Sequence, residues 1–307
     1  MVKFTVPSPG KPFLAFKTFA GTVYLEGQTN RPISSECSIC NSASGFFIKE
    51  DLVATNFHCI KDCIEIRAHI DYQMDDDVLS DHYFSQVYIV EGFTAVDALN
   101  DIAILKVKPH NNYFLNLYNY NEGYIERGAN IFVAGNPRLI RNAFSDGIIS
   151  SSHPMPYSCR FFTMTAPVSP GSSGGPVVNS QGQVIAMVNG TYKDKKHNDG
   201  KQSQNLNLAI PSFLITKLLN SNSKNVNPLS DLKVYEAKSY CEYGFELLAA
   251  AEYDMAIDMS IKSIQCYDQQ SDCDFVNKGK QAAVRLIETA EKSRTNAINI
   301  RKAMKID

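Results

Sequence analysis

Hydrophobic positions in the first two thirds of the chain fall into short runs rather than into a helical period. Between about residues 20 and 210, β-prone runs alternate with Gly, Asn, Asp and Pro. Five of these runs are 45–48, 64–68, 87–90, 131–134 and 184–188. Many short strands separated by turn residues are typical of an all-β barrel or sandwich. The pattern therefore predicts a mainly β domain over this part of the chain.

The pattern changes after a polar stretch at 220–228, whose composition is that of a linker. Beyond this stretch the hydrophobic period becomes helical, which predicts helices over 237–268 and over about 274–304. We therefore expect a β domain at 1–222, a linker at 223–231 and a small all-α domain at 232–307.

Composition narrows the possible partners. With 307 residues, of which 44% are hydrophobic, the chain can form about two domains with real cores. Its net charge of −2 argues against a nucleic-acid partner, and it has no run of eighteen or more apolar residues that would span a membrane. The first ten residues lack the apolar region of a signal peptide. A cytoplasmic protein is the default expectation, and export by another route stays open.

The segment 169–176, with the sequence SPGSSGGP, carries the strongest chemical signal. A serine hydroxyl is a poor nucleophile unless a base takes its proton and donors stabilise the oxyanion that forms on the substrate. Here Ser173 would be the nucleophile, and the flanking glycines would let the N–H groups of Gly171 and Ser173 converge on one point. A Gly/Ser-rich surface loop is the alternative interpretation of the same residues.

A serine nucleophile needs an oriented imidazole and a carboxylate that holds it. His58 directly follows the apolar, β-prone run 52–57 and precedes a cysteine, which is true of no other histidine in the chain. Asp101 stands at the start of the run 102–107, which is apolar enough to be a buried strand. A carboxylate in that position can be partly desolvated and still kept charged by hydrogen bonds.

These three blocks, in the order His58, Asp101 and Ser173, resemble the chymotrypsin/trypsin-like serine peptidases, and most closely the HtrA/Deg type. The resemblance spans roughly residues 15–220; it includes the nucleophile segment 165–187 and the closing strand 207–211, which is followed by a helical pattern at 212–219. It implies two six-stranded antiparallel β-barrels with the catalytic triad between them. The full expectation is a mainly β chymotrypsin-like fold followed by a small all-α domain.

The resemblance also implies a role for each residue. His58 would be general base and then general acid, Asp101 would hold its tautomer, and Ser173 would attack the scissile carbonyl through an acyl-enzyme intermediate. The N–H groups of Gly171 and Ser173 would form the oxyanion hole. Ser172 stands where zymogen-activated relatives carry an aspartate, so activation by propeptide cleavage is not expected. The reaction needs no metal or other cofactor, and none is expected.

The resemblance places the primary specificity pocket next to the nucleophile segment. Its base would lie near Pro167 and Val168, and its far wall near Leu206 and Leu208. No acidic residue stands at these positions to attract Arg or Lys. Protein or peptide substrates with a small or medium apolar residue before the scissile bond are therefore expected.

The helical part resembles a tetratricopeptide repeat of two antiparallel helices. The matching positions are Tyr240, Tyr243, Gly244, Leu247, Tyr253, Ala256 and Ile257, whereas Ser263 and Asp268 depart from the pattern. A single unit cannot bury its own hydrophobic face, so the helix at about 274–304 is expected to cap it. Residues 236–274 hold nine acidic and two basic side chains, and 278–305 hold eight basic and two acidic. These charges fit attraction between packed helices, or a surface that docks a protein partner.

Four cysteines flank His58, and their state is open. The spacings of Cys37, Cys40, Cys59 and Cys63 fit free thiols or a zinc site. The resemblance implies a further alternative, a disulfide from Cys59 to Cys40 or Cys37. A similar choice exists for the acidic cluster Asp71, Asp75, Asp76, Asp77 and Asp81, which is a solvated loop or a calcium site.

The leading hypothesis is a serine endopeptidase. The alternative is a degenerate protease fold that serves as a binding or chaperone-like module through its helical tail.

Overall fold

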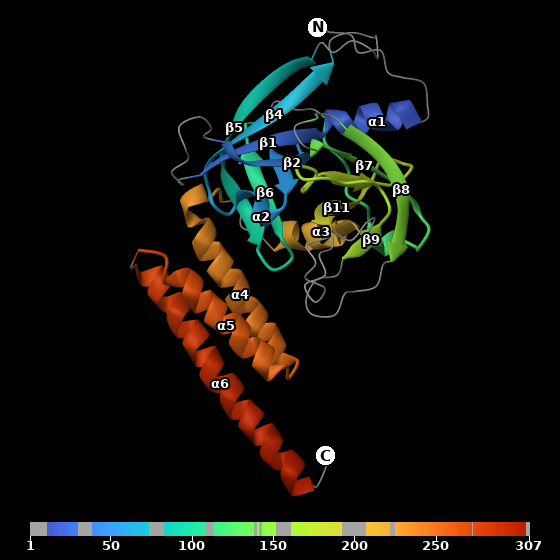
Figure 1. Ribbon diagram of the computed structural model, residues 1–307. Coiled ribbons are helices and arrows are strands. Elements are labelled where there is room, and N and C mark those ends of the chain that lie inside the picture. Colours follow the sequence, from blue (N-terminus) through green and yellow to red (C-terminus); the bar gives the residue numbers. More distant parts are fainter. Residues whose placement is uncertain are drawn as a thin grey trace, which may run out of the picture. The chain divides into compact units, whose positions relative to one another are not determined.

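The chain forms two compact units in the computed structural model (Figure 1). The structure describes residues 11–29, 39–73, 83–108, 113–137, 140, 143–151, 161–191, 207–221, 225–271 and 273–304. The first unit comprises Met1–Ala95 and Asn100–Leu229, and the second comprises Val96–Leu99 and Ser230–Asp307. The predicted boundaries at residues 222 and 232 therefore stand close to the division between the units, although four residues near 96–99 group with the helices.

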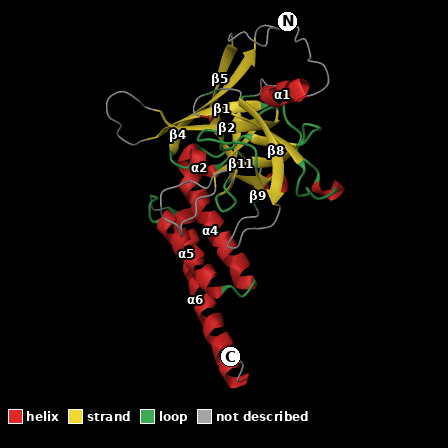
Figure 2. Ribbon diagram, turned by 45° about the vertical axis from the view of Figure 1, so that its right-hand side comes forward, coloured by secondary structure: helices red, strands yellow, loops and turns green. Residues whose placement is uncertain are grey.

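Two closed six-stranded barrels make up the first unit, as predicted (Figure 2). The first barrel has the strand order β1-β2-β3-β6-β5-β4. Its strands are β1 (Thr22–Thr29), β2 (Ile39–Lys49), β3 (Leu52–Thr55), β4 (Cys63–Gln73), β5 (Tyr83–Asp97) and β6 (Ile102–Val107). The short helix α2 (Phe57–Ile60) connects β3 to β4.

The second barrel repeats this plan with the order β10-β11-β12-β9-β8-β7. Its strands are β7 (Asn130–Gly135), β8 (Ala143–Ser151), β9 (Phe162–Met164), β10 (Pro176–Val178), β11 (Val184–Thr191) and β12 (Asn207–Pro211). A 3-10 turn, Tyr120–Glu122, precedes it, α1 (Lys11–Ala20) precedes the first barrel, and α3 (Ser212–Asn220) follows the second. All five β-prone runs of the sequence lie in strands of the two barrels.

One hydrophobic core runs through both barrels. It includes Phe46 and Ile104 of the first barrel and Phe132, Met187 and Ile210 of the second. The helices α1 and α3 add side chains to the same cluster. Residues 102–105 of β6 are all fully buried, which explains why this strand is a continuous apolar run rather than an alternating one. Because the core is shared, the relative placement of the two barrels is set by packing rather than by the chain connection alone.

Helix α1 and the segment 225–229 are both attached to the barrels by contacts of their residues. Phe19 of α1 packs edge-on against Phe144 of β8, with ring centroids 5.6 Å apart. In the expected linker, Asn227 exchanges two backbone hydrogen bonds with Phe93 of β5, at 2.8 and 2.9 Å. Gly92 has to be a glycine here, because a Cβ atom at this position would collide with the Asn227 carbonyl. Residues 225–229 are therefore attached to the first barrel.

The second unit is a three-helix arrangement of α4 (Leu232–Ala249), α5 (Tyr253–Tyr267) and α6 (Asp274–Met304), preceded by a 3-10 turn at Leu229–Asp231. The three helices approach closely at Gly244, where a Cβ atom would lie 2.7 Å from Leu286 of α6 and 3.3 Å from the Ala256 carbonyl of α5. This is the close contact that the sequence predicted for Gly244 and Ala256. The likeness to a tetratricopeptide repeat remains a prediction.

The segregated charges of this unit meet across α5 and α6. Lys280 lies 3.0 Å from Asp268, and Arg294 lies 2.5 Å from Asp254. Exposed pairs of this kind contribute about 0–1 kcal/mol each. None of the helices that the structure describes is both long and apolar enough to cross a bilayer.

Candidate active site

His58 and Asp101 come from two neighbouring strand ends of the first barrel. His58 lies in α2, one turn beyond β3, and Asp101 immediately precedes β6, which pairs with β3. The backbone carbonyl of Asp101 accepts hydrogen bonds from the Phe57 N–H (3.2 Å) and from the side-chain amide of Asn56 (3.1 Å). The pairing of β3 with β6 and these two bonds fix the histidine-bearing turn relative to Asp101.

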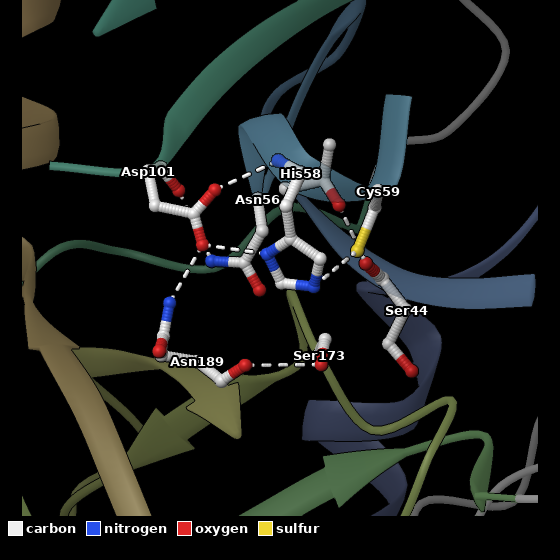
Figure 3. A network of polar contacts seen from close by, with 8 residues as sticks. Ser44, Asn56, His58, Cys59, Asp101, Ser173 and Asn189 are labelled. Atoms are coloured by element: carbon white, nitrogen blue, oxygen red, sulfur yellow. Dashed lines mark hydrogen bonds and ion pairs between the residues drawn. The ribbon is translucent and has the colours of Figure 1, made fainter. Parts of the chain in front are cut away.

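The Asp101 carboxylate is held by three donors (Figure 3). Its Oδ1 accepts the backbone N–H of His58 at 2.7 Å. Its Oδ2 lies 2.6 Å from Nδ1 of His58 and accepts the side-chain N–H of Asn189 at 2.6 Å. The side chain is 17% exposed, so these donors replace most of the water that would otherwise solvate its charge.

The imidazole of His58 faces two acidic groups. Nδ1 pairs with Asp101, and Nε2 lies 3.4 Å from the sulfur of Cys59. Burial lowers the pKa of His58, but the hydrogen bonds to Asp101 and Cys59 and their charges outweigh it and raise the pKa from 6.5 to about 10. The surroundings therefore favour the imidazolium, and His58 can act as a general base only in the molecules in which it is neutral.

Ser173 lies on the loop between β9 and β10 of the second barrel. The loop is a series of tight turns, in which Ser172 N–H donates to Ser169 (2.9 Å) and Gly175 N–H donates to Ser172 (2.9 Å). Gly174 has a φ of +84°, and a Cβ atom there would collide with the carbonyl of Ser44. Only glycine suits such a position, which explains the Gly that follows the serine in the motif.

The Ser173 hydroxyl donates to the backbone carbonyl of Asn189, with Oγ 3.0 Å from the oxygen. In the described part of the chain, no hydrogen bond joins this hydroxyl to His58. The structure thus brings Ser173, His58 and Asp101 together around Asn189, with the Ser173 side chain turned toward Asn189 rather than toward Nε2 (Figure 3).

Two backbone donors beside Ser173 have no partner among the described residues. They are the N–H groups of Gly171 and Ser173, which the motif predicted as oxyanion donors. Gly171 is buried and has a φ of +96°. Nearly all buried backbone N–H groups in proteins are hydrogen-bonded, so an unpaired one beside a serine hydroxyl points to a ligand atom. A carbonyl oxygen that gains negative charge is such a ligand.

The structure describes three of the four predicted specificity residues. Pro167 is exposed and Val168 is half-buried on the segment after β9, and Leu208 is 9% exposed on β12. Leu206 lies outside the described residues. Asn207, which sequence reasoning missed, is buried and donates to the Ala166 carbonyl at 2.8 Å, so it links β12 to the segment that carries Pro167 and Val168.

Cys59 and Cys63 are buried, and neither forms a disulfide with another described residue. The Cys63 thiol lies 3.6 Å from the Cys59 carbonyl, and Asn41 contacts the Cys63 sulfur at 3.7 Å. Cys37 and the side chain of Cys40 lie outside the described residues, as do the side chains of the acidic cluster at residues 71–81. Within the described ranges, no three His, Cys, Asp or Glu side chains converge as metal ligands do.

Sequence reasoning also missed Asn189 and Ser44. Asn189 lies in β11 at the point where the register of β11 against β12 shifts, between Val188 and Gly190. The only indication of Asn189 in the sequence is that a polar residue ends the apolar run 184–188.

Comparison with known proteins finds similarity between the two-barrel unit and serine peptidases. Residues 43–187 match the family model described as the trypsin-like peptidase domain. The chain is 26% identical over 216 residues to the mitochondrial serine protease HTRA2 of Bos taurus, which covers 68% of this chain and 42% of that protein. It is 25% identical over 231 residues to a probable periplasmic DegP-like serine endoprotease of Chlamydia pneumoniae, which covers 70% of this chain and 42% of that protein.

An uncharacterized protein of Sinorhizobium fredii is 30% identical over 168 residues, which cover 52% of this chain and 24% of that protein. The chain thus spans less than half the length of these relatives. A crystal structure of the serine endoprotease from Yersinia pestis has the same fold, with a TM-score of 0.53 and 20% identity over 70% of this chain and 67% of that one. The two-barrel unit of this chain is thus similar to trypsin-like serine peptidases, and the named serine proteases among the relatives above include HtrA- and DegP-type proteins.

Proposed function

We propose that this protein is a serine endopeptidase that hydrolyses peptide bonds of protein substrates through Ser173, His58 and Asp101. The observation that carries the proposal is the 2.6 Å contact between Asp101 and Nδ1 of His58. A carboxylate at Nδ1 leaves Nε2 as the nitrogen that can exchange a proton with a serine hydroxyl. The match of residues 43–187 to the trypsin-like peptidase domain supports this reading.

The reaction begins with a rotation of the Ser173 side chain. The hydroxyl leaves the Asn189 carbonyl and turns to Nε2 of His58, which takes its proton as Oγ bonds to the scissile carbonyl carbon. The carbonyl oxygen becomes an oxyanion and is held by the N–H groups of Gly171 and Ser173. The imidazolium then gives its proton to the leaving amine as the C–N bond breaks, and water, activated in turn by His58, hydrolyses the acyl-enzyme.

The substrate preference follows from the residues near the expected pocket. Pro167, Val168 and Leu208 offer no charge to a side chain of the substrate. A small or medium apolar residue before the scissile bond fits these walls better than Arg or Lys does. The helical unit is the candidate surface for a protein partner.

The test is cleavage of a peptide library derived from a whole proteome by the wild type, Ser173→Ala and His58→Ala. We expect cleavage after small or medium apolar residues by the wild type and loss of all cleavage in both variants. The binding or chaperone-like module would instead be favoured if the folded wild type cleaved no peptide and if wild type and Ser173→Ala prevented the aggregation of an unfolded protein equally well.

A further inference from the structure

Ser44 of β2 connects the first barrel to the nucleophile loop of the second. It is fully buried and stands 127 residues before Gly171 in the chain. Figure 3 shows Ser44 on the opposite side of Ser173 from Asn189. No sequence motif singled it out.

All three polar groups of Ser44 are engaged. Its N–H donates to the carbonyl of Ser173 at 2.8 Å, and its hydroxyl donates to the carbonyl of Gly171 at 2.8 Å. Its own carbonyl accepts the hydroxyl of Thr55 at 2.8 Å, which ties it to β3. Both bonds to the loop thus end on the carbonyls of Gly171 and Ser173, whose N–H groups have no partner in the described part of the chain.

Asn136, at the end of β7, fixes the direction of the hydroxyl bond. Its backbone N–H donates to Ser44 Oγ at 2.9 Å, and its side-chain amide lies 3.4 Å from the same oxygen. Since Oγ accepts from Asn136, its single proton is left for Gly171. Asn136 is 2% exposed, so water does not compete for this bond.

Gly171 needs such a restraint. A glycine passes between backbone conformations at little cost, and a rotation about its backbone bonds would turn its N–H away from the substrate. A bond to its carbonyl from a rigid, buried strand holds the residue in one orientation. The Ser173 carbonyl is held from the same strand, so the two oxyanion donors share one anchor.

We propose that Ser44 is a positioning residue that sets the geometry of the oxyanion hole from the first barrel. The inference rests on the proposed function, since an oxyanion hole matters only if the protein forms a tetrahedral intermediate. Ser44 does not touch the substrate; it acts through Gly171 and Ser173.

The test compares Ser44→Ala with the matched control Thr18→Val. Thr18 is also fully buried, and its hydroxyl donates to a backbone carbonyl, that of Leu14 in α1, at 2.7 Å. For Ser44→Ala we expect kcat on a cleaved peptide to fall about 10- to 100-fold, the range for a small misplacement of catalytic groups. KM should change little, because the loss affects the transition state and not substrate binding. Thr18→Val should keep both constants.

A peptide aldehyde supplies a second readout. Its hemiacetal with Ser173 places an oxygen in the oxyanion hole, so its affinity for Ser44→Ala should fall by the same factor as kcat. A merely structural role would lower the folded fraction and leave both quantities unchanged per folded molecule. If Ser44→Ala does not fold, Ser44→Cys takes its place, because its thiol is similar in size and a much weaker hydrogen-bond donor.

The inference is overturned if kcat and aldehyde affinity of the folded variant stay within about threefold of Thr18→Val, or if only KM changes. In that case a wild type that still cleaves peptides leaves the proposed function intact. A wild type that neither cleaves peptides nor binds the aldehyde overturns both.

Discussion

Asp101 has a φ of +58°, in the left-handed region that non-glycine residues seldom adopt. Aspartate tolerates this region better than most residues, and strain of this kind persists only where the surroundings impose it. Here two bonds to the Asp101 carbonyl and three to its carboxylate impose it. The conformation lets one residue present its carbonyl to the β3–α2 turn and its carboxylate to His58.

Asn189 is predicted to hold the Asp101 carboxylate in line with His58. Asn189→Ala removes one of three donors to a charged group, a loss of about 1.5–3 kcal/mol. If the transition state loses this stabilisation, kcat/KM falls about 10- to 100-fold. Steady-state kinetics on a cleaved peptide measure the effect.

The control for this change is Asn179→Ala, which removes an amide that bonds Gln183 at 2.9 Å and whose side-chain hydrogen bonds to described residues stay within the β10–β11 turn. Equal kcat/KM values for the two variants would show that Asn189 is dispensable to Asp101.

Cys59 is predicted to shift the pH profile of activity. Burial lowers the pKa of His58; the hydrogen bond to Asp101 raises it most, and the hydrogen bond and charge of Cys59 raise it further. His58 accepts a proton only when neutral, so activity appears as pH rises through its pKa. Cys59→Ala lowers that pKa and should move the ascending limb of kcat/KM against pH to lower pH.

Cys63→Ala is the matched control for Cys59→Ala, because the Cys63 thiol contacts the Cys59 backbone and not the imidazole. An ascending limb at the same pH in Cys59→Ala and wild type would refute the role of the thiol.

The candidate triad His58, Asp101 and Ser173 could be proposed from the sequence because each residue stands inside a recognisable motif. Asn189, Ser44 and Asn136 could not. Each is a single polar residue at or near the middle or end of a strand, and its contact partner lies 88, 127 or 92 residues away. Such contacts depend on barrel closure, which no local pattern encodes.

At the scale of elements, the turn from α4 to α5 contains a conformation that its sequence does not favour. Ala251 has a φ of +63° directly after α4 and is exposed. Helices commonly end with a residue in this region, and it is usually glycine because other residues pay a steric cost. The turn is held by backbone bonds from Ala251 to Leu248 (3.1 Å) and from Glu252 to Leu247 (2.9 Å).

Ala251→Gly is therefore predicted to stabilise the helical unit. Relief of the left-handed conformation is worth about 1–2 kcal/mol, and the added freedom of the unfolded chain costs about 0.4–1 kcal/mol. The net gain of roughly 0.5–1 kcal/mol should raise the midpoint of urea unfolding followed by circular dichroism at the helix band.

Ala249→Gly gives the opposite expectation, because Ala249 is an exposed residue within α4 and glycine there costs up to about 1 kcal/mol. If Ala251→Gly also lowered the urea midpoint, the left-handed conformation of Ala251 would be contradicted.

The elements themselves were largely predictable. Each β-prone run became a strand, although Ile64, Val87 and Ile89 in two of these runs are exposed, and the 3.6-residue period beyond residue 232 became helices. The linker was only partly anticipated, because its polar sequence gives no sign that Asn227 pairs with Phe93. That pairing depends on Gly92, whose missing side chain makes room for it.

At the scale of the molecule, the chain combines a peptidase domain with a helical unit. The proposed catalytic groups are divided between the barrels, since His58 and Asp101 belong to the first and Ser173 to the second. The common core and the Ser44 bonds hold these halves together. The proposed active site thus depends on the packed pair of barrels and is complete in neither barrel alone.

The most direct test of the account is labelling of the intact protein with a fluorophosphonate, followed by mass spectrometry of its peptides. The probe bonds only to a serine that is activated by a base beside an oxyanion hole. We expect a single adduct on Ser173, lost in Ser173→Ala and in His58→Ala, and retained in Asn179→Ala. A folded wild-type protein that carries no adduct, or one that carries it on another residue, would contradict Ser173 as the nucleophile.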